Sequence, residues 1–126
     1  MKRIYIALLF IILSFTAAAI QTGYLNAKAD MFNSYIHKTD KLIKQEDFLE
    51  AINLCKETER KWEDSTKIIN LLLSHQYTDN IGIEISQMRT AAENKNISLY
   101  LEKSTSVKQE LKSIKNGELP LAENIL

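Results

Sequence analysis

The chain has 126 residues, with 16 lysines and arginines balanced by 16 aspartates and glutamates. The length suffices for one small domain, and the charge balance excludes the basic surface that nucleic-acid binding requires. The only cysteine, Cys55, allows no intramolecular disulfide and no multi-cysteine metal centre, so we expect it to be a small buried hydrophobic residue in a fold held by packing.

The N-terminal segment has the pattern of a membrane-targeting sequence. Lys2 and Arg3 precede an interval without charged residues that ends at Ala27 and is long enough to cross a bilayer. The positive-inside rule predicts that these two basic residues stay in the cytoplasm. We therefore expect a protein of the cell membrane with a single span in residues 1–27 and an extracytoplasmic helical domain in residues 28–126.

A cleaved signal peptide is the alternative interpretation of the same segment. Small residues occupy the positions that signal peptidase requires before Ile20 and before Asp30, so cleavage would follow Ala19 or Ala29. The product would be a secreted helical protein. Against this, an apolar stripe follows the segment directly, which predicts that the membrane helix continues out of the bilayer.

The rest of the chain has an all-α composition, because only three glycines and one proline interrupt a sequence rich in Leu, Ile, Lys, Glu and Ala. From Met31 to Ile43 apolar residues recur three or four apart, which predicts an amphipathic helix with Asp40 turned away from its apolar face. Residues 44–47 are expected to form a turn. Asp47, with Glu50 three residues later, has the spacing that caps a second helix.

The second helix is expected to run from Phe48 to about His75. Its apolar seam includes Cys55 and Trp62, and Trp62 is predicted to lie in the core rather than on a binding surface. Asp64-Ser65 leaves open a kink or a restart. A polar cluster, residues 75–80, then interrupts the seam.

A third apolar stripe and a fourth helix follow. The third stripe consists of Ile81, Ile85, Met88 and Ala92. Residues 93–96 form the next turn, with Asn96 as the cap of a last helix that ends at Asn116-Gly117. The core positions predicted for that helix are Ile97, Leu101, Ser104, Val107, Leu111 and Ile114, and the tail, residues 119–126, is expected to dock on the helices.

These elements predict a fold class. It is all-α: an N-terminal transmembrane helix followed by a small antiparallel array of two stacked helical hairpins, resembling a four-helix bundle. The two hairpins have similar sequences around their turns, at residues 44–48 and 93–97, and any antiparallel bundle would give the same pattern.

The polar cluster contains the only candidate site residues. His75 and Asp79 share one helical face, an arrangement suited to a divalent metal or to acid–base chemistry. Two ligands fall short of the three or four that a zinc site takes, and the other histidine, His37, belongs to another helix. We interpret His75 and Asp79 as a hydrogen-bonded structural pair that fixes a bend. No catalytic residue, metal site or cofactor is expected.

Several short motifs resemble one family of bacterial proteins. They are Lys2-Arg3 before the apolar segment, Glu46-Asp47-Phe48, Lys61-Trp62, His75 followed by Asp79 and Ile81, and Glu123-Asn124-Ile125-Leu126. Together they resemble domain-of-unknown-function family four-three-six-three, short membrane-anchored proteins found mainly in Gram-positive, often spore-forming bacteria. The resemblance covers nearly the whole chain. It implies a single anchor, an all-helical outer domain and a membrane partner, and it implies no particular activity.

The sequence thus predicts a protein that is not an enzyme. We expect an interaction or accessory module of the bacterial cell envelope, tethered by one helix, whose partner is another envelope or membrane protein. The rival hypotheses are a metal- or small-ligand-binding envelope protein that uses His75 and Asp79, and a secreted helical protein. The identity of the partner and the oligomeric state are left open.

Overall fold

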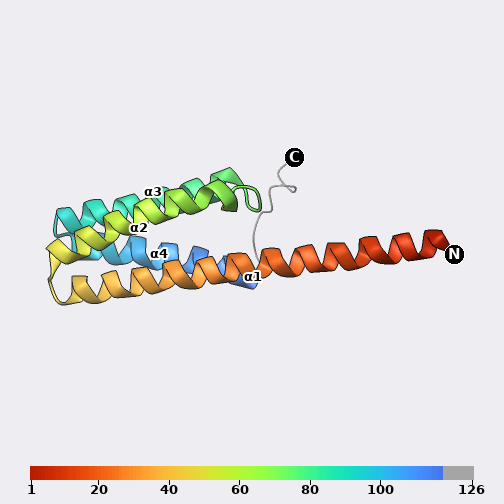
Figure 1. Cartoon of the computed structure of the whole chain (residues 1–126). Coiled ribbons are helices and arrows are strands. Elements are labelled where there is room, and N and C mark those ends of the chain that lie inside the picture. The colour runs from red at the N-terminus through yellow and green to blue at the C-terminus, as the bar shows by residue number, and fades with distance from the viewer. Residues whose placement is uncertain (118–126) are drawn as a thin grey trace.

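The computed structural model describes residues 1–117, which form four helices and no strand (Figure 1). They are α1 (Lys2–Lys44), α2 (Phe48–Ile69), α3 (His75–Glu93) and α4 (Ile97–Asn116). This confirms the all-α prediction. The expectation that residues 119–126 dock on the helices falls outside the described residues.

Helix α1 joins the apolar N-terminal segment to the packed part of the molecule. It has 43 residues without a break, which corresponds to a length of about 65 Å. Its N-terminal half protrudes from the bundle with exposed side chains, and Leu25 is its first buried residue (Figure 1). Among residues 1–117, α1 is the one helix long and apolar enough to cross a membrane. The prediction that the apolar helix continues into the following one is confirmed.

The C-terminal part of α1 packs with the other three helices as an antiparallel bundle. Helix α1 packs against α2 and α4, and α3 packs against the same two helices. The hairpins α1–α2 and α3–α4 therefore stack on each other and close into a four-helix arrangement, as predicted.

The turns inside the two hairpins have the same design. Glu46 and Lys95 take positive φ angles of 58° and 54°, and the next residue caps the following helix. The Asp47 side chain accepts a hydrogen bond from the Glu50 amide at 3.4 Å, and the Asn96 side chain accepts one from the Leu99 amide at 3.1 Å. These caps confirm both predicted turns.

The connection between α2 and α3 was placed wrongly. Helix α2 runs through Ser65 without a break but ends at Ile69, and the polar cluster forms the first turns of α3 rather than an interruption. Ser74 caps α3 by accepting a hydrogen bond from the Tyr77 amide at 3.1 Å. The prediction failed because residues 68–73 contain neither glycine nor proline and read as a continuing apolar helix.

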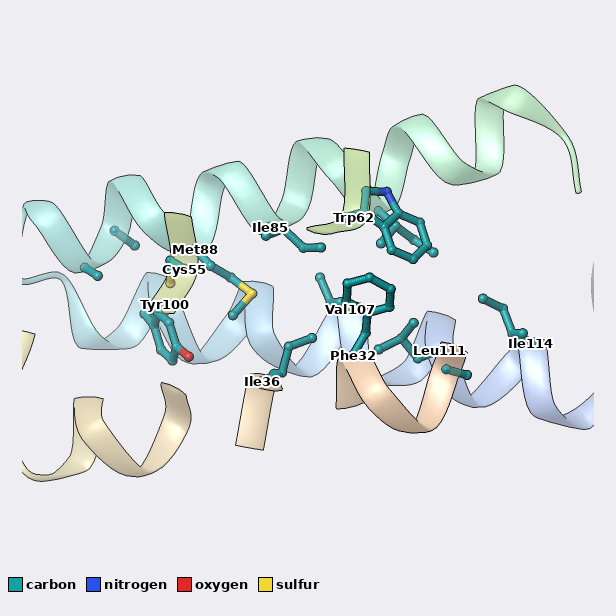
Figure 2. Close-up of a cluster of buried hydrophobic side chains, with 14 of the residues drawn as sticks. Phe32, Ile36, Cys55, Trp62, Ile85, Met88, Tyr100, Val107, Leu111 and Ile114 are labelled. Carbon is teal, nitrogen blue, oxygen red and sulfur yellow. The ribbon is translucent and has the colours of Figure 1, made fainter. Parts of the chain in front are cut away.

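The core lies between all four helices (Figure 2). Trp62 is only 3% exposed and its ring meets Phe32 edge to face, with centroids 5.0 Å apart. Cys55 is buried two turns earlier on α2, near Met88 and Tyr100 (Figure 2), so both residues are core residues as predicted. In α4 one predicted core position is wrong: Leu101 lies at the surface and Tyr100 is buried in its place.

Candidate functional site

His75 and Asp79 both lie exposed on the first two turns of α3. No hydrogen bond or ion pair joins them within the described part of the chain, so their interpretation as a bonded structural pair is wrong. The structural residue of this cluster is Thr78, which lies buried between them. Its hydroxyl donates to the side-chain carbonyl of Asn70, and its backbone carbonyl accepts a hydrogen bond from the Trp62 indole at 3.0 Å.

The two histidines lie in different places. His37 lines a cleft of about 290 Å³ between α1 and α4, whose other walls include Lys108, Lys112 and Lys115. Lys115 is paired with Asp30, which also lines the cleft, at 2.6 Å, and Lys108 is paired with Asp40 at 2.7 Å, so these carboxylates already have cationic partners. Across residues 1–117, no three histidine, cysteine, aspartate or glutamate side chains are grouped as a metal site would require.

A buried carboxylate joins α1 to α4. Asp40 is 6% exposed, and its Oδ1 accepts hydrogen bonds from the Tyr100 hydroxyl at 2.9 Å and the Ser104 hydroxyl at 2.6 Å. Its Oδ2 accepts one from the Lys108 ammonium at 2.7 Å. We call these four residues the α1–α4 network. The prediction that Asp40 turns away from the core is wrong, because these three donors replace the water that the carboxylate loses on burial.

The α1–α4 network has no free group for catalysis. Burial raises the pKa of Tyr100, and the neighbouring Asp40 charge raises it further, so the phenol stays protonated and acts as a donor. Both oxygens of the carboxylate are occupied, and the ammonium is held in an ion pair. The network therefore fixes the register of α4 against α1.

Two acidic residues, Glu84 on α3 and Glu110 on α4, lie close to each other. Burial, followed by the charge and the hydrogen bond of Glu84, raises the pKa of Glu110 to about 7. Glu84 accepts a hydrogen bond from Ser106 at 2.8 Å. The buried Oε2 atoms of both acids have no hydrogen-bonding partner within residues 1–117, and protonation of Glu110 removes the repulsion between the two neighbouring carboxylates.

A groove of about 430 Å³ runs between α2 and α3. Trp62 lines it together with Gly82, where a Cβ atom would stand 3.3 Å from the indole Cδ1, so glycine lets α3 approach the ring closely. Ile83 contributes an exposed apolar side chain. Further lining residues are Glu59, Glu63, Thr66, Thr78, Asp79 and Ser86.

The groove has an acidic rim, and one of its acids is held in an ion pair. Glu59 is held by the Arg89 guanidinium at 2.6 Å, and Arg89 also bonds Glu93 at 3.0 Å. Glu63 and Asp79 line the same groove. Of the sequence candidates, Asp79 therefore belongs to a concave surface, although without His75. The sequence signal for the groove was Gly82, a glycine inside a helical pattern.

Comparison with known proteins identifies one family. The family model described as Domain of unknown function (DUF4363) matches residues 19–125. Neither the curated proteins nor the solved structures contain a significant match. The matched region begins inside the apolar half of α1 and includes the whole packed part of the described chain.

Proposed function

The chain belongs to the DUF4363 family, and from this premise we propose that it is a membrane-tethered interaction module of the bacterial cell envelope, which acts by binding and not by catalysis. The observation that carries this proposal is the double role of α1. One uninterrupted helix presents apolar side chains to its surroundings in its first half and is built into the bundle in its second half. The bundle is thus attached rigidly to whatever surrounds the apolar half.

A bilayer is the environment that matches the exposed half of α1. Large apolar side chains are exposed on every side between Ile4 and Ile20, and no other described helix covers them. A helix that is apolar all round belongs in a core or in a membrane. In the proposed orientation Lys2 and Arg3 stay in the cytoplasm and the bundle lies outside.

The packing of α1 also bears on signal cleavage. Cleavage after Ala29 would remove Leu25 and Ala29, which are both buried against the bundle. This favours retention of the segment over cleavage at that position. Cleavage after Ala19 would leave the core intact, and release of such a product is an outcome that the topology experiment below detects.

Binding is favoured over catalysis by the state of the polar groups. The donors and acceptors of the α1–α4 network are bonded to one another, and the Glu84–Glu110 pair is half-buried between two helices. The groove beside Trp62, in contrast, is open, with an apolar wall at Ile83 and acidic residues on its rim. We propose that it accepts an apolar segment with a basic residue from another envelope or membrane protein.

Photocrosslinking in the membranes of the native host tests this proposal. A photoreactive amino acid replaces Ile83 in the groove, and in the control it replaces Gln109, an exposed residue on α4. We expect one discrete adduct from the Ile83 position, identified by mass spectrometry, and no such adduct from the Gln109 position. Equal labelling from both positions, or none from Ile83, contradicts docking in the groove.

A further inference from the structure

The loop between α2 and α3 presents an apolar surface. Leu71 is 78% exposed and Ile68 is 52% exposed, and no charged residue occurs in residues 68–74. The polar side chains of the loop point inward: Asn70 accepts a hydrogen bond from Thr78, and Ser74 is buried as the cap of α3. An exposed apolar tip with its polar groups turned inward is unfavourable in water.

The backbone N–H groups of this loop are hydrogen-bonded within the chain. The amides of Asn70 and Leu71 donate to carbonyls of α2 at 2.9 and 3.0 Å. Those of Leu72 and Leu73 both donate to the Ile69 carbonyl, at 2.9 and 2.8 Å. Four successive N–H groups are thus satisfied inside the chain, which lowers the cost of moving these donors into hydrocarbon.

The loop lies beside the apolar half of α1, at the end of the bundle from which that half protrudes (Figure 1). A groove of about 500 Å³ separates the two segments. Its walls are Ala17, Ile20, Gln21 and Tyr24 on α1, and Ile68, Leu71 and Leu72 on the loop side. The apolar surface of the loop is therefore continuous with the apolar surface of α1.

The depth of the loop follows from helix geometry. A hydrocarbon layer of about 30 Å spans roughly 20 helical residues at about 1.5 Å each. Counted from Ile4, this layer extends to the neighbourhood of Gly23. The α1 wall of the groove, from Ala17 to Gln21, then lies within the outer part of the hydrocarbon layer, with Tyr24 at the interface.

We propose that the α2–α3 loop is a second membrane contact, which inserts Ile68, Leu71 and Leu72 into the outer leaflet so that lipid acyl chains fill the groove between the loop and α1. This inference rests on the proposed function, because it requires α1 to span the bilayer. The two contacts fix the bundle upright on the membrane. The turns at the far end of the bundle, between α1 and α2 and between α3 and α4, then face away from the lipid.

Depth-dependent fluorescence quenching tests the insertion. Three full-length variants, Leu71→Cys, Leu49→Cys and Phe15→Cys, are labelled with an environment-sensitive fluorophore and reconstituted in phosphatidylcholine vesicles that contain lipids with nitroxide-labelled acyl chains. Leu49 is the matched control, since it is 70% exposed but lies at the opposite end of α2. Phe15, 74% exposed on α1, reports on the span itself. The native Cys55 is buried and stays unlabelled.

The three probe positions test the membrane contact of the loop separately from the membrane span of α1. We expect strong quenching and blue-shifted emission at positions 15 and 71, and unquenched, red-shifted emission at position 49. Quenching at position 15 without quenching at position 71 overturns the second contact and leaves the span intact. An unquenched probe at position 15 overturns both the span and the contact.

Discussion

Replacing Trp62 by alanine is a quantitative test of the bundle packing. A buried tryptophan removes about 200 Å² from water, and at about 25 cal/mol per Å² this burial stabilises the fold by several kcal/mol. Its hydrogen bond to the Thr78 carbonyl contributes about 1 kcal/mol. We therefore expect Trp62→Ala to lower the free energy of unfolding by roughly 3 to 5 kcal/mol, a large part of the stability of a small domain.

The close approach at Gly82 adds a second measurement to the same test. Gly82→Ala gains up to about 1 kcal/mol of helix propensity, but its new methyl group meets the Trp62 indole at 3.3 Å. In the Trp62→Ala background this contact is absent and the methyl group helps to fill the cavity. Gly82→Ala should therefore stabilise the Trp62→Ala variant more than it stabilises the parent chain.

Thermal unfolding of the full chain in mild detergent, followed by far-UV circular dichroism, measures both effects. The expected loss for Trp62→Ala corresponds to a decrease in melting temperature of roughly 15 °C or more. A variant that melts within one or two degrees of the parent would show that Trp62 is not packed between the helices. Equal effects of Gly82→Ala in both backgrounds would refute the close contact between α3 and the indole.

Three further predictions concern polar residues of the bundle, each checked by the same melting curves. Lys108→Met should lower the melting temperature more than Lys112→Met, because only Lys108 balances the buried carboxylate of the α1–α4 network; equal effects would refute that role. The pKa of Glu110 is raised from 4.5 to about 7, so the folded state binds the proton more tightly than the unfolded state does. The stability gained from this proton is fully present below the pKa of the unfolded chain and is lost as the pH rises through about 7. Glu110→Gln should flatten this decline between about pH 5 and pH 8, and an unchanged decline would assign it to other groups. His75→Ala should leave the melting temperature unchanged since the side chain is exposed, whereas a clear decrease would restore its structural role.

Local sequence signals predicted most helix ends. Asp47 and Asn96 cap helices through bonds to amides three residues later, and Gly117 ends α4 with a left-handed φ of 71°. These features depend on residues within one turn, so they are readable without tertiary contacts. The turn after Ile69 lacked such a residue at its start. Its signal was Ser74, whose capping hydroxyl stands directly before α3.

The buried polar contacts could not be predicted from local sequence patterns, because the residues that bond to each other are distant in the sequence. Asp40 and Tyr100 are 60 residues apart, and nothing near either residue indicates the other. Asp40 does follow Ile36 by four residues, so helical spacing alone placed it on the buried face. Its charge favoured the opposite assignment, and only the donors supplied by α4 reverse that preference.

The prediction for His75 and Asp79 failed because the start of α3 was misplaced. Both residues share a helical face as predicted, but the start of α3 determines which face that is. With the helix beginning at His75, Thr78 points into the bundle, whereas His75 and Asp79 are exposed. The structural role predicted for His75 and Asp79 therefore belongs to Thr78.

Topology labelling in intact protoplasts tests the central claim that α1 anchors an external bundle. A full-length Leu49→Cys variant is treated with a membrane-impermeant maleimide, and the parent chain, whose Cys55 is buried, serves as the unlabelled control. We expect Leu49→Cys to be labelled before lysis and to remain in the membrane fraction at full length. Labelling only after lysis would contradict the orientation, and a shortened, labelled product in the medium would contradict the anchor.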